Sequence, residues 1–100
     1  MIIKWSQLSE RQLKEIFDYY SFEISPRIAR KIINKIIVKV SLLENNPLVG
    51  QKEELLIDYE EDFRYLIGSN YKIIYWGDEN NITIASVFDC RQNHHKMKLL

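Results

Sequence analysis

The amino-acid sequence predicts an α+β domain: an N-terminal strand, an antiparallel helical hairpin, then a three-stranded antiparallel meander. Two stretches in the first half repeat apolar residues at helical spacing, whereas residues 63–88 contain three short runs rich in aromatic and β-branched residues. Gly68-Ser69-Asn70 and the polar residues 78–81 separate these runs and have turn chemistry. Links this short join neighbouring strands antiparallel, because a parallel pair needs a long crossover.

The chain is expected to begin with a strand and a first helix. Ile2 to Trp5 is short and largely apolar, as a strand would be. Ser9 and Gln12 have the spacing of a capping box and predict the start of the helix. Apolar residues recur at i, i+3, i+4 and i+7, which predicts one buried stripe on a helix ending near Ser21. The stripe consists of Leu13, Ile16, Phe17 and Tyr20.

The second helix has clearer end signals. Ser25 can cap it, and Pro26 fits its first position, where the missing N–H costs nothing. Asn45-Asn46-Pro47 is expected to end it. Its predicted buried stripe is Ala29, Ile32, Ile33, Ile36, Val40 and Leu43. Arg27, Lys31, Lys35 and Lys39 line the opposite side, which we interpret as either a solvated face or a docking surface.

Residues 48–62 lack a clear periodic pattern, and we predict an ordered loop. Six carboxylates surround the apolar Leu55-Leu56-Ile57 in this segment. The segment is therefore interpreted as solvated, unless it shields basic groups of the sheet or of the C-terminal end.

Length and composition predict a single globular domain over residues 1–100 with no membrane partner. The chain is 46% hydrophobic, and no apolar run is long enough to span a bilayer. The N-terminus lacks signal-peptide features, and the single cysteine, Cys90, excludes an internal disulfide. These observations fit a cytoplasmic protein.

The charges balance overall but are segregated along the chain. There are 14 basic and 14 acidic residues, with a net +3 in residues 1–50, −5 in residues 51–80 and +2 in residues 81–100. A nucleic-acid-binding domain is typically strongly basic, because it neutralises phosphates. The overall charge therefore does not indicate nucleic-acid binding.

Four candidate binding residues cluster on the central predicted hairpin: Arg64, Tyr71, Lys72 and Tyr75. One interpretation places Arg64 and Lys72 on a shared sheet face, where they would bind an anion or an acidic partner segment. In the other, Arg64 bonds to the acidic segment just before it and the tyrosines pack on the helices.

The residues at and after the end of the last predicted strand include candidate reactive groups. Adjacent His94 and His95 have the chemistry of a general acid and base, but we interpret His95 as part of a solvated tail, whereas both interpretations stay open for His94. Arg91 could lower the pKa of Cys90 and make it reactive, whereas a lone cysteine at a strand end is more often a small buried hydrophobe. No spacing indicates a zinc site.

Several motifs in this order resemble a known family over essentially the whole chain. They are Ile3-Lys4-Trp5-Ser6, Leu13…Ile16…Tyr19-Tyr20, Ala29…Ile33…Leu42-Leu43…Asn46-Pro47…Gly50, Phe63-Arg64…Gly68…Tyr71-Lys72-Ile73-Ile74-Tyr75 and Ile84-Ala85-Ser86-Val87-Phe88…Arg91. The chain resembles the RelE/ParE superfamily of toxins from bacterial type II toxin–antitoxin modules. The resemblance implies a β-α-α-β-β-β fold, in agreement with the prediction from the residue pattern.

The resemblance implies alternative functions. RelE-like members are metal-independent endoribonucleases that cleave ribosome-bound messenger RNA with arginines at the scissile phosphate. The candidate catalytic residues here would be Lys72, Arg91 and His94, but Lys72 replaces an arginine and gives no bidentate phosphate contact. The ParE-like branch is therefore favoured, whose members bind and poison DNA gyrase. A degenerate toxin fold that only binds antitoxin is the third alternative.

The resemblance also implies partners. A cognate antitoxin would wrap the helices and sheet with a flexible C-terminal segment, giving complexes such as a heterotetramer and a role in plasmid stabilization. The expected binding residues are Arg64, Tyr71, Lys72, Tyr75 and Arg91, with no cofactor and no metal.

Overall fold

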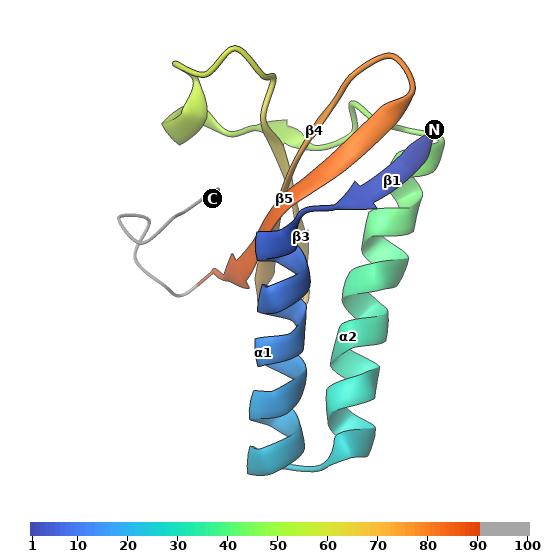
Figure 1. The fold of residues 1–100 in the computed structure, drawn as a ribbon, viewed down its shortest axis with the longest axis vertical. Helices are drawn as coiled ribbons and strands as arrows, with labels where there is room; N and C mark the ends of the chain where they lie inside the picture. The colour runs from blue at the N-terminus through green and yellow to red at the C-terminus, as the bar shows by residue number, and fades with distance from the viewer. Residues whose placement is uncertain (91–100) are drawn as a thin grey trace.

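In the computed structural model, which describes residues 1–90, a helical hairpin packs against one face of a five-stranded sheet (Figure 1). The elements are β1 (Ile2–Trp5), α1 (Gln7–Glu23), α2 (Pro26–Ser41), β2 (Gln51–Lys52), β3 (Arg64–Gly68), β4 (Tyr71–Gly77) and β5 (Asn81–Asp89), with the 3-10 turns η1 (Leu42–Glu44) and η2 (Glu54–Leu56). The prediction of a strand, a helical hairpin and an antiparallel meander is confirmed.

The sheet order is β1-β5-β4-β3-β2, and β1 runs parallel to β5 while the other pairs are antiparallel. Ile2 lies opposite Asn81 and Trp5 lies opposite Ile84, so β1 forms one edge of the sheet beside β5. The segment 48–62, predicted as a loop, contains the short edge strand β2 and the turn η2.

The first helix begins earlier than the capping box predicted. Ser6 is the N-cap and accepts a hydrogen bond from the Ser9 N–H at 3.0 Å. Ser9 lies buried inside the first turn, so its prediction as the cap is wrong. Gln12 instead accepts hydrogen bonds from the Val87 N–H at 2.7 Å and from the Ser86 hydroxyl at 3.2 Å. This side chain takes the place of a strand partner where β5 extends past the end of β1.

The second helix follows its predicted signals. Ser25 accepts a hydrogen bond from the Ile28 N–H at 3.2 Å, and Pro26 occupies the first helical position. Four of the six predicted stripe residues are buried and the other two are partly buried: Ala29, Ile36, Val40 and Leu43, then Ile32 and Ile33. Neither helix within residues 1–90 has the length and apolar character needed to cross a membrane.

Hydrophobic side chains cover both faces of the sheet. The helices pack on one face through a cluster that includes Ile36, Leu43 and Ile73. On the other face, Leu56 and Phe63 pack against a second cluster that includes Ile74. Central strand β4 is therefore buried on both sides between Tyr71 and Tyr75.

Candidate functional site

The candidate residues on the central hairpin divide between the two faces of the sheet. Successive side chains of a strand point to opposite faces, so Tyr71 and Tyr75 face the helices and Lys72 faces away. Arg64 lies directly opposite Tyr75, whereas Lys72 lies opposite Ile67. Arg64 and Lys72 therefore do not share a face, and the interpretation that placed them together is wrong.

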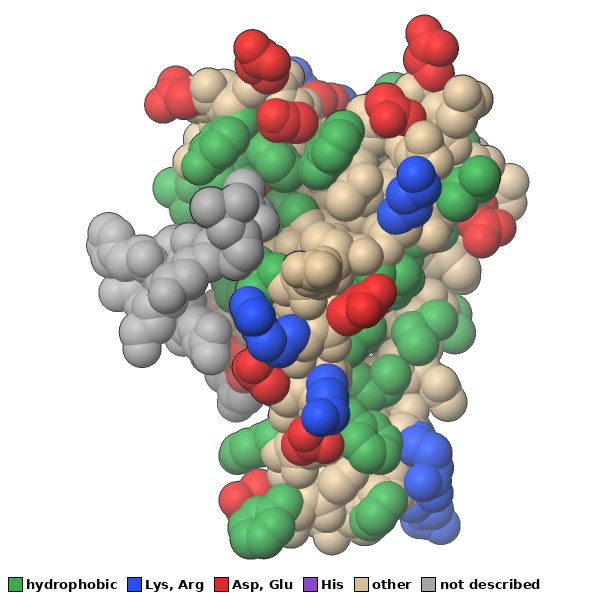
Figure 2. All heavy atoms as spheres, viewed as in Figure 1, with side chains coloured by type: hydrophobic (Ala, Val, Ile, Leu, Met, Phe, Trp, Pro, Cys, Tyr) green, Lys and Arg blue, Asp and Glu red, His purple; other side chains and the backbone are tan. Residues whose placement is uncertain are grey.

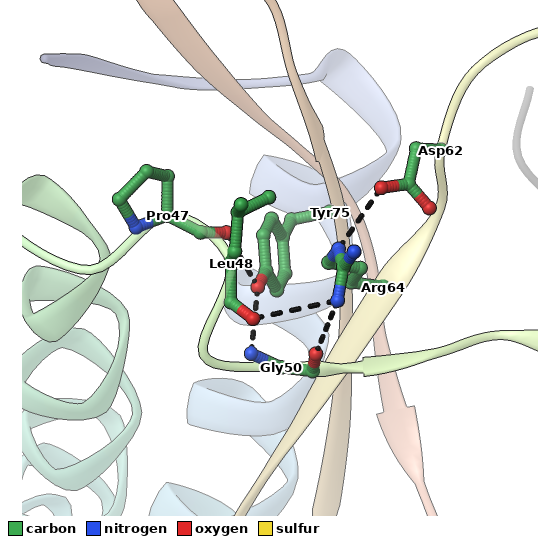
Figure 3. Close-up of polar contacts among 6 residues, drawn as sticks. All are labelled: Pro47, Leu48, Gly50, Asp62, Arg64 and Tyr75. Carbon is green, nitrogen blue, oxygen red and sulfur yellow. Dashed lines mark hydrogen bonds and ion pairs between the residues drawn. The ribbon is translucent and has the colours of Figure 1, made fainter.

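Tyr75 and Arg64 anchor the loop between α2 and β2 (Figure 3). The Tyr75 hydroxyl donates to the Pro47 carbonyl at 2.8 Å and accepts from the Gly50 N–H at 3.0 Å. Arg64 Nη1 donates to the carbonyls of Gly50 at 3.0 Å and Leu48 at 3.4 Å. We call these residues the loop anchor.

Arg64 also forms an ion pair with the acidic segment that precedes it. Its Nε lies 3.0 Å from Asp62 Oδ2, and its side chain is 18% exposed. The alternative interpretation of Arg64, a bond to the preceding acidic segment, matches this geometry. The Arg64 guanidinium thus bonds to the Leu48 and Gly50 carbonyls and to Asp62. A binding role for Arg64 or Tyr75 stays a prediction.

Removing the Tyr75 hydroxyl is expected to destabilise the fold. Burial raises the pKa of Tyr75, so the hydroxyl stays protonated and keeps donating to Pro47. Tyr75→Phe leaves the Gly50 N–H and the Pro47 carbonyl without this partner, which is expected to cost about 2 kcal/mol of unfolding free energy. Urea denaturation followed by circular dichroism measures this loss.

A control variant and a pH series test whether the Tyr75 hydroxyl stabilises the fold. Tyr65→Phe deletes a hydroxyl whose bond to Gln51 is exposed, and it is expected to cost less than about 0.5 kcal/mol. Because the folded pKa of Tyr75 is raised, its hydroxyl stabilises the fold below the unfolded pKa of about 10, and this contribution is lost at higher pH. The difference between wild type and Tyr75→Phe should therefore narrow above about pH 10; a constant difference contradicts the assignment.

Lys72 is held in a buried cluster on the face away from the helices. Its Nζ forms an ion pair with the Glu53 carboxylate and lies 4.2 Å from the centroid of the Tyr65 ring. The Lys72 and Glu53 side chains are only 10% and 4% exposed. The charge of Lys72 is thus neutralised inside the protein and does not face solvent. No local pattern distinguishes Glu53 from the other five acids of residues 53–62 as the partner of Lys72.

Tyr71 contributes to a cavity of about 570 Å³ between α1 and the end of the β4–β5 hairpin. Its hydroxyl donates to the Tyr20 hydroxyl at 3.4 Å, and the Tyr20 ring contacts Tyr19 edge-on with centroids 5.1 Å apart. We call this cavity the tyrosine pocket, and its lining is Gln12, Glu15, Ile16, Tyr19, Tyr20, Tyr71, Val87, Phe88 and Asp89. Aromatic rings beside carboxylates suit an amphipathic or cationic protein segment.

Residues 3–94 match the family described as the ParE toxin of the type II toxin–antitoxin system, parDE. The chain belongs to the ParE toxin family. Among solved structures, it is similar to a chain of the chromosomal ParDE toxin–antitoxin system from P. aeruginosa, with a TM-score of 0.74 and 21% identity over 89% of this chain and 95% of that one. It is also similar to the YoeB dimer from Staphylococcus aureus, with a TM-score of 0.57 and 22% identity over 86% and 92%. A search of curated proteins finds no match.

The remaining predicted residues of this ParE family member lie at the C-terminal end. Arg91, His94 and His95 lie outside the described residues. Cys90 is exposed, so its interpretation as a buried hydrophobe is wrong. Its N–H donates to the Asn70 carbonyl at 2.8 Å, which closes the end of the hairpin.

The sequence reasoning missed most of the tyrosine pocket. It identified Tyr71 but assigned Tyr20 to the buried stripe and Gln12 to a capping box, and it gave no binding role to Glu15 or Tyr19. The available signal was the pair Tyr19-Tyr20, because Tyr20 completes the i, i+3, i+4, i+7 stripe that starts at Leu13, whereas Tyr19 lies outside that stripe. Tyr19 is 59% exposed at the pocket rim.

Proposed function

We propose that this toxin-family protein arrests growth by binding and poisoning DNA gyrase and is neutralised by a cognate antitoxin. The proposal is supported by membership of the ParE toxin family over residues 3–94. It is a protein-binding function that requires no hydrolytic site on this chain.

The buried state of Lys72 is the observation that carries the proposal. Phosphodiester cleavage needs positive charge directed at the developing phosphorane oxygens. Lys72 forms a buried ion pair with Glu53 and contacts the Tyr65 ring, and Arg64 lies on the other face of the sheet. Among residues 1–90, the predicted ribonuclease candidate is therefore not presented to a phosphate, which favours gyrase binding over cleavage of ribosome-bound messenger RNA.

The lining of the tyrosine pocket supports the proposal that a segment of the antitoxin binds there. It places exposed aromatic and acidic groups beside the stretch of β5 that extends past β1. A chain that folds on binding can bury aromatic anchors there, and Tyr19 offers a large ring at low conformational cost. Within this proposal the antitoxin covers the pocket and part of the helical hairpin.

The gyrase proposal is tested with purified protein and no RNA. We expect the protein to inhibit supercoiling by gyrase, and RNase treatment of the reaction should leave the inhibition unchanged. In bacteria, a pulse of the protein alone should arrest growth and switch on a DNA-damage reporter. Arrest with the reporter silent and messages cleaved would support the ribonuclease instead. Normal growth would indicate a degenerate toxin fold that only binds antitoxin.

A further inference from the structure

Helix α2 presents a basic face on the side away from the sheet. It contains five basic residues and no acidic one: Arg27, Arg30, Lys31, Lys35 and Lys39. None of the five forms an ion pair with another residue in the described range 1–90. Figure 2 shows Lys and Arg side chains gathered at the edge of the molecule where Figure 1 places the first turns of α2. Within the described part of the chain, the charge of this face is therefore not neutralised.

The basic face is a shallow groove between two rows of side chains on α2 and its C-cap residue, Leu42. Both rows have i, i+4 spacing. One row is basic along its whole length and consists of Arg27, Lys31, Lys35 and Lys39; the other changes from polar to apolar and consists of Arg30, Asn34, Val38 and Leu42. Val38 and Leu42 are 63% and 52% exposed. We call this surface the basic groove.

The arrangement of cations along α2 is unfavourable for the chain alone. Like charges at i and i+4 destabilise a helix, and every neighbouring pair in the basic row has this spacing. The first turn of α2 also has no acidic residue, although the helix dipole favours negative charge there. Carboxylates of a partner placed along the groove would relieve both effects.

The two rows have the geometry of a helix-packing surface. A groove between i, i+4 rows accepts the i, i+3 rows of a second helix with the two axes about 20° apart, so the helices run side by side. The basic row from Arg27 to Lys39 rises about 18 Å along the axis of α2. A partner helix of similar length would contact the cations and also reach Val38 and Leu42.

We propose that the basic groove binds an acidic amphipathic helix of a partner protein. The carboxylates of that helix lie against the basic row, and its apolar residues pack on Val38 and Leu42. Duplex DNA would also neutralise the cations, but its phosphates would leave the exposed apolar side chains without apolar partners. The basic groove shares no lining residue with the tyrosine pocket, so it is a second and separate partner surface.

Binding of designed helical peptides to the purified full-length chain tests the proposal. Each peptide of about 20 residues carries glutamates at one end and leucines at the other end of a single helical stripe. Both orders are made, so that the stripe can match the groove with the helices parallel or antiparallel. By isothermal titration calorimetry in 50 mM NaCl, one order should bind with a dissociation constant of about 100 μM or tighter. A peptide of the same composition, with the leucines on the face opposite the glutamates, should bind about tenfold or more weakly.

Substitutions in the groove identify the surface. Lys31→Glu with Lys35→Glu should raise the dissociation constant about tenfold or more, and a peptide with two glutamates replaced by lysine should restore binding to this variant. Val38→Ala with Leu42→Ala should raise the dissociation constant about fivefold, because apolar contacts are lost. All four residues are exposed, and circular dichroism confirms that each variant is folded.

Arg11→Glu with Lys14→Glu is the matched control, because it makes the same change in charge at exposed positions of α1. It should change the dissociation constant less than about twofold. An equal loss in the control, equal binding of the two leucine arrangements, or no binding of either order overturns the proposal. Duplex DNA or a second copy of the chain would be the occupant instead if it binds more tightly than the peptide and is released by Lys31→Glu with Lys35→Glu, which also overturns the proposal.

Discussion

Replacing Gly50 by alanine is expected to reduce the unfolding free energy by about 3 kcal/mol. A Cβ at this position would lie 2.6 Å from the Tyr75 hydroxyl oxygen and 2.7 Å from the Tyr65 carbonyl oxygen. Neither atom can move away cheaply, because Tyr75 is 1% exposed in the core and the Tyr65 carbonyl belongs to a sheet strand. Relief of the clash would break the hydrogen bonds of the loop anchor. Urea denaturation measures the effect.

Gly77→Ala is the matched control. It also adds one methyl group to a glycine of the same sheet region, but its Cβ would meet nothing closer than 3.4 Å. Its expected effect is less than about 1 kcal/mol in either direction. If Gly50→Ala and Gly77→Ala unfold at the same urea concentration, the close approach at Gly50 does not constrain the fold.

The fold was predictable because its signals are local. Helical spacing, the Ser25-Pro26 start and turn residues between β-rich runs each act over a few positions, and the structure follows them. The cap of α1 was not predictable in this way. Ser6 also donates to the Ala85 carbonyl at 2.9 Å, 79 residues along the chain, so a tertiary contact selects Ser6 over Ser9. The pairing of β1 with β5 is equally distant in sequence and leaves no local pattern.

The pairing of β3 with β4 in the structure differs by one residue in register from the pairing that would place Arg64 and Lys72 on one face. A three-residue link at Gly68-Ser69-Asn70 would place Arg64 and Lys72 on the same face. Gly68 instead pairs with Tyr71, and the turn contains only two residues, with Ser69 at φ 58°. A one-residue shift reverses the face of every side chain on a strand. The interpretation with one shared face therefore depended on a turn one residue longer than the turn in the structure.

Replacing Lys72 by methionine is expected to cost about 3 kcal/mol of unfolding free energy. The substitution keeps most of the side-chain volume but leaves the Glu53 carboxylate, 4% exposed, without its cation. Glu53→Gln should cost a similar amount, because it leaves the buried Lys72 ammonium without its carboxylate partner. The double variant Lys72→Met/Glu53→Gln buries no charge and should recover about 2 kcal/mol relative to the sum of the single losses.

Thermodynamic cycles from urea denaturation measure this coupling. Lys52→Met removes an exposed lysine from edge strand β2 and should change stability by less than about 0.5 kcal/mol. Additive single losses, with no recovery in the double variant, would mean that the ion pair contributes no coupling energy.

The double variant also separates the structural role of Lys72 from a chemical one. It provides a protein that folds without the lysine, which the single variant does not guarantee. If the toxin acts by binding gyrase through other surfaces, the double variant should arrest growth as the wild type does. If Lys72 polarises a scissile phosphate, arrest should be lost although the protein is folded. Loss of arrest in a folded double variant would thus contradict the gyrase proposal and restore Lys72 as a catalytic residue.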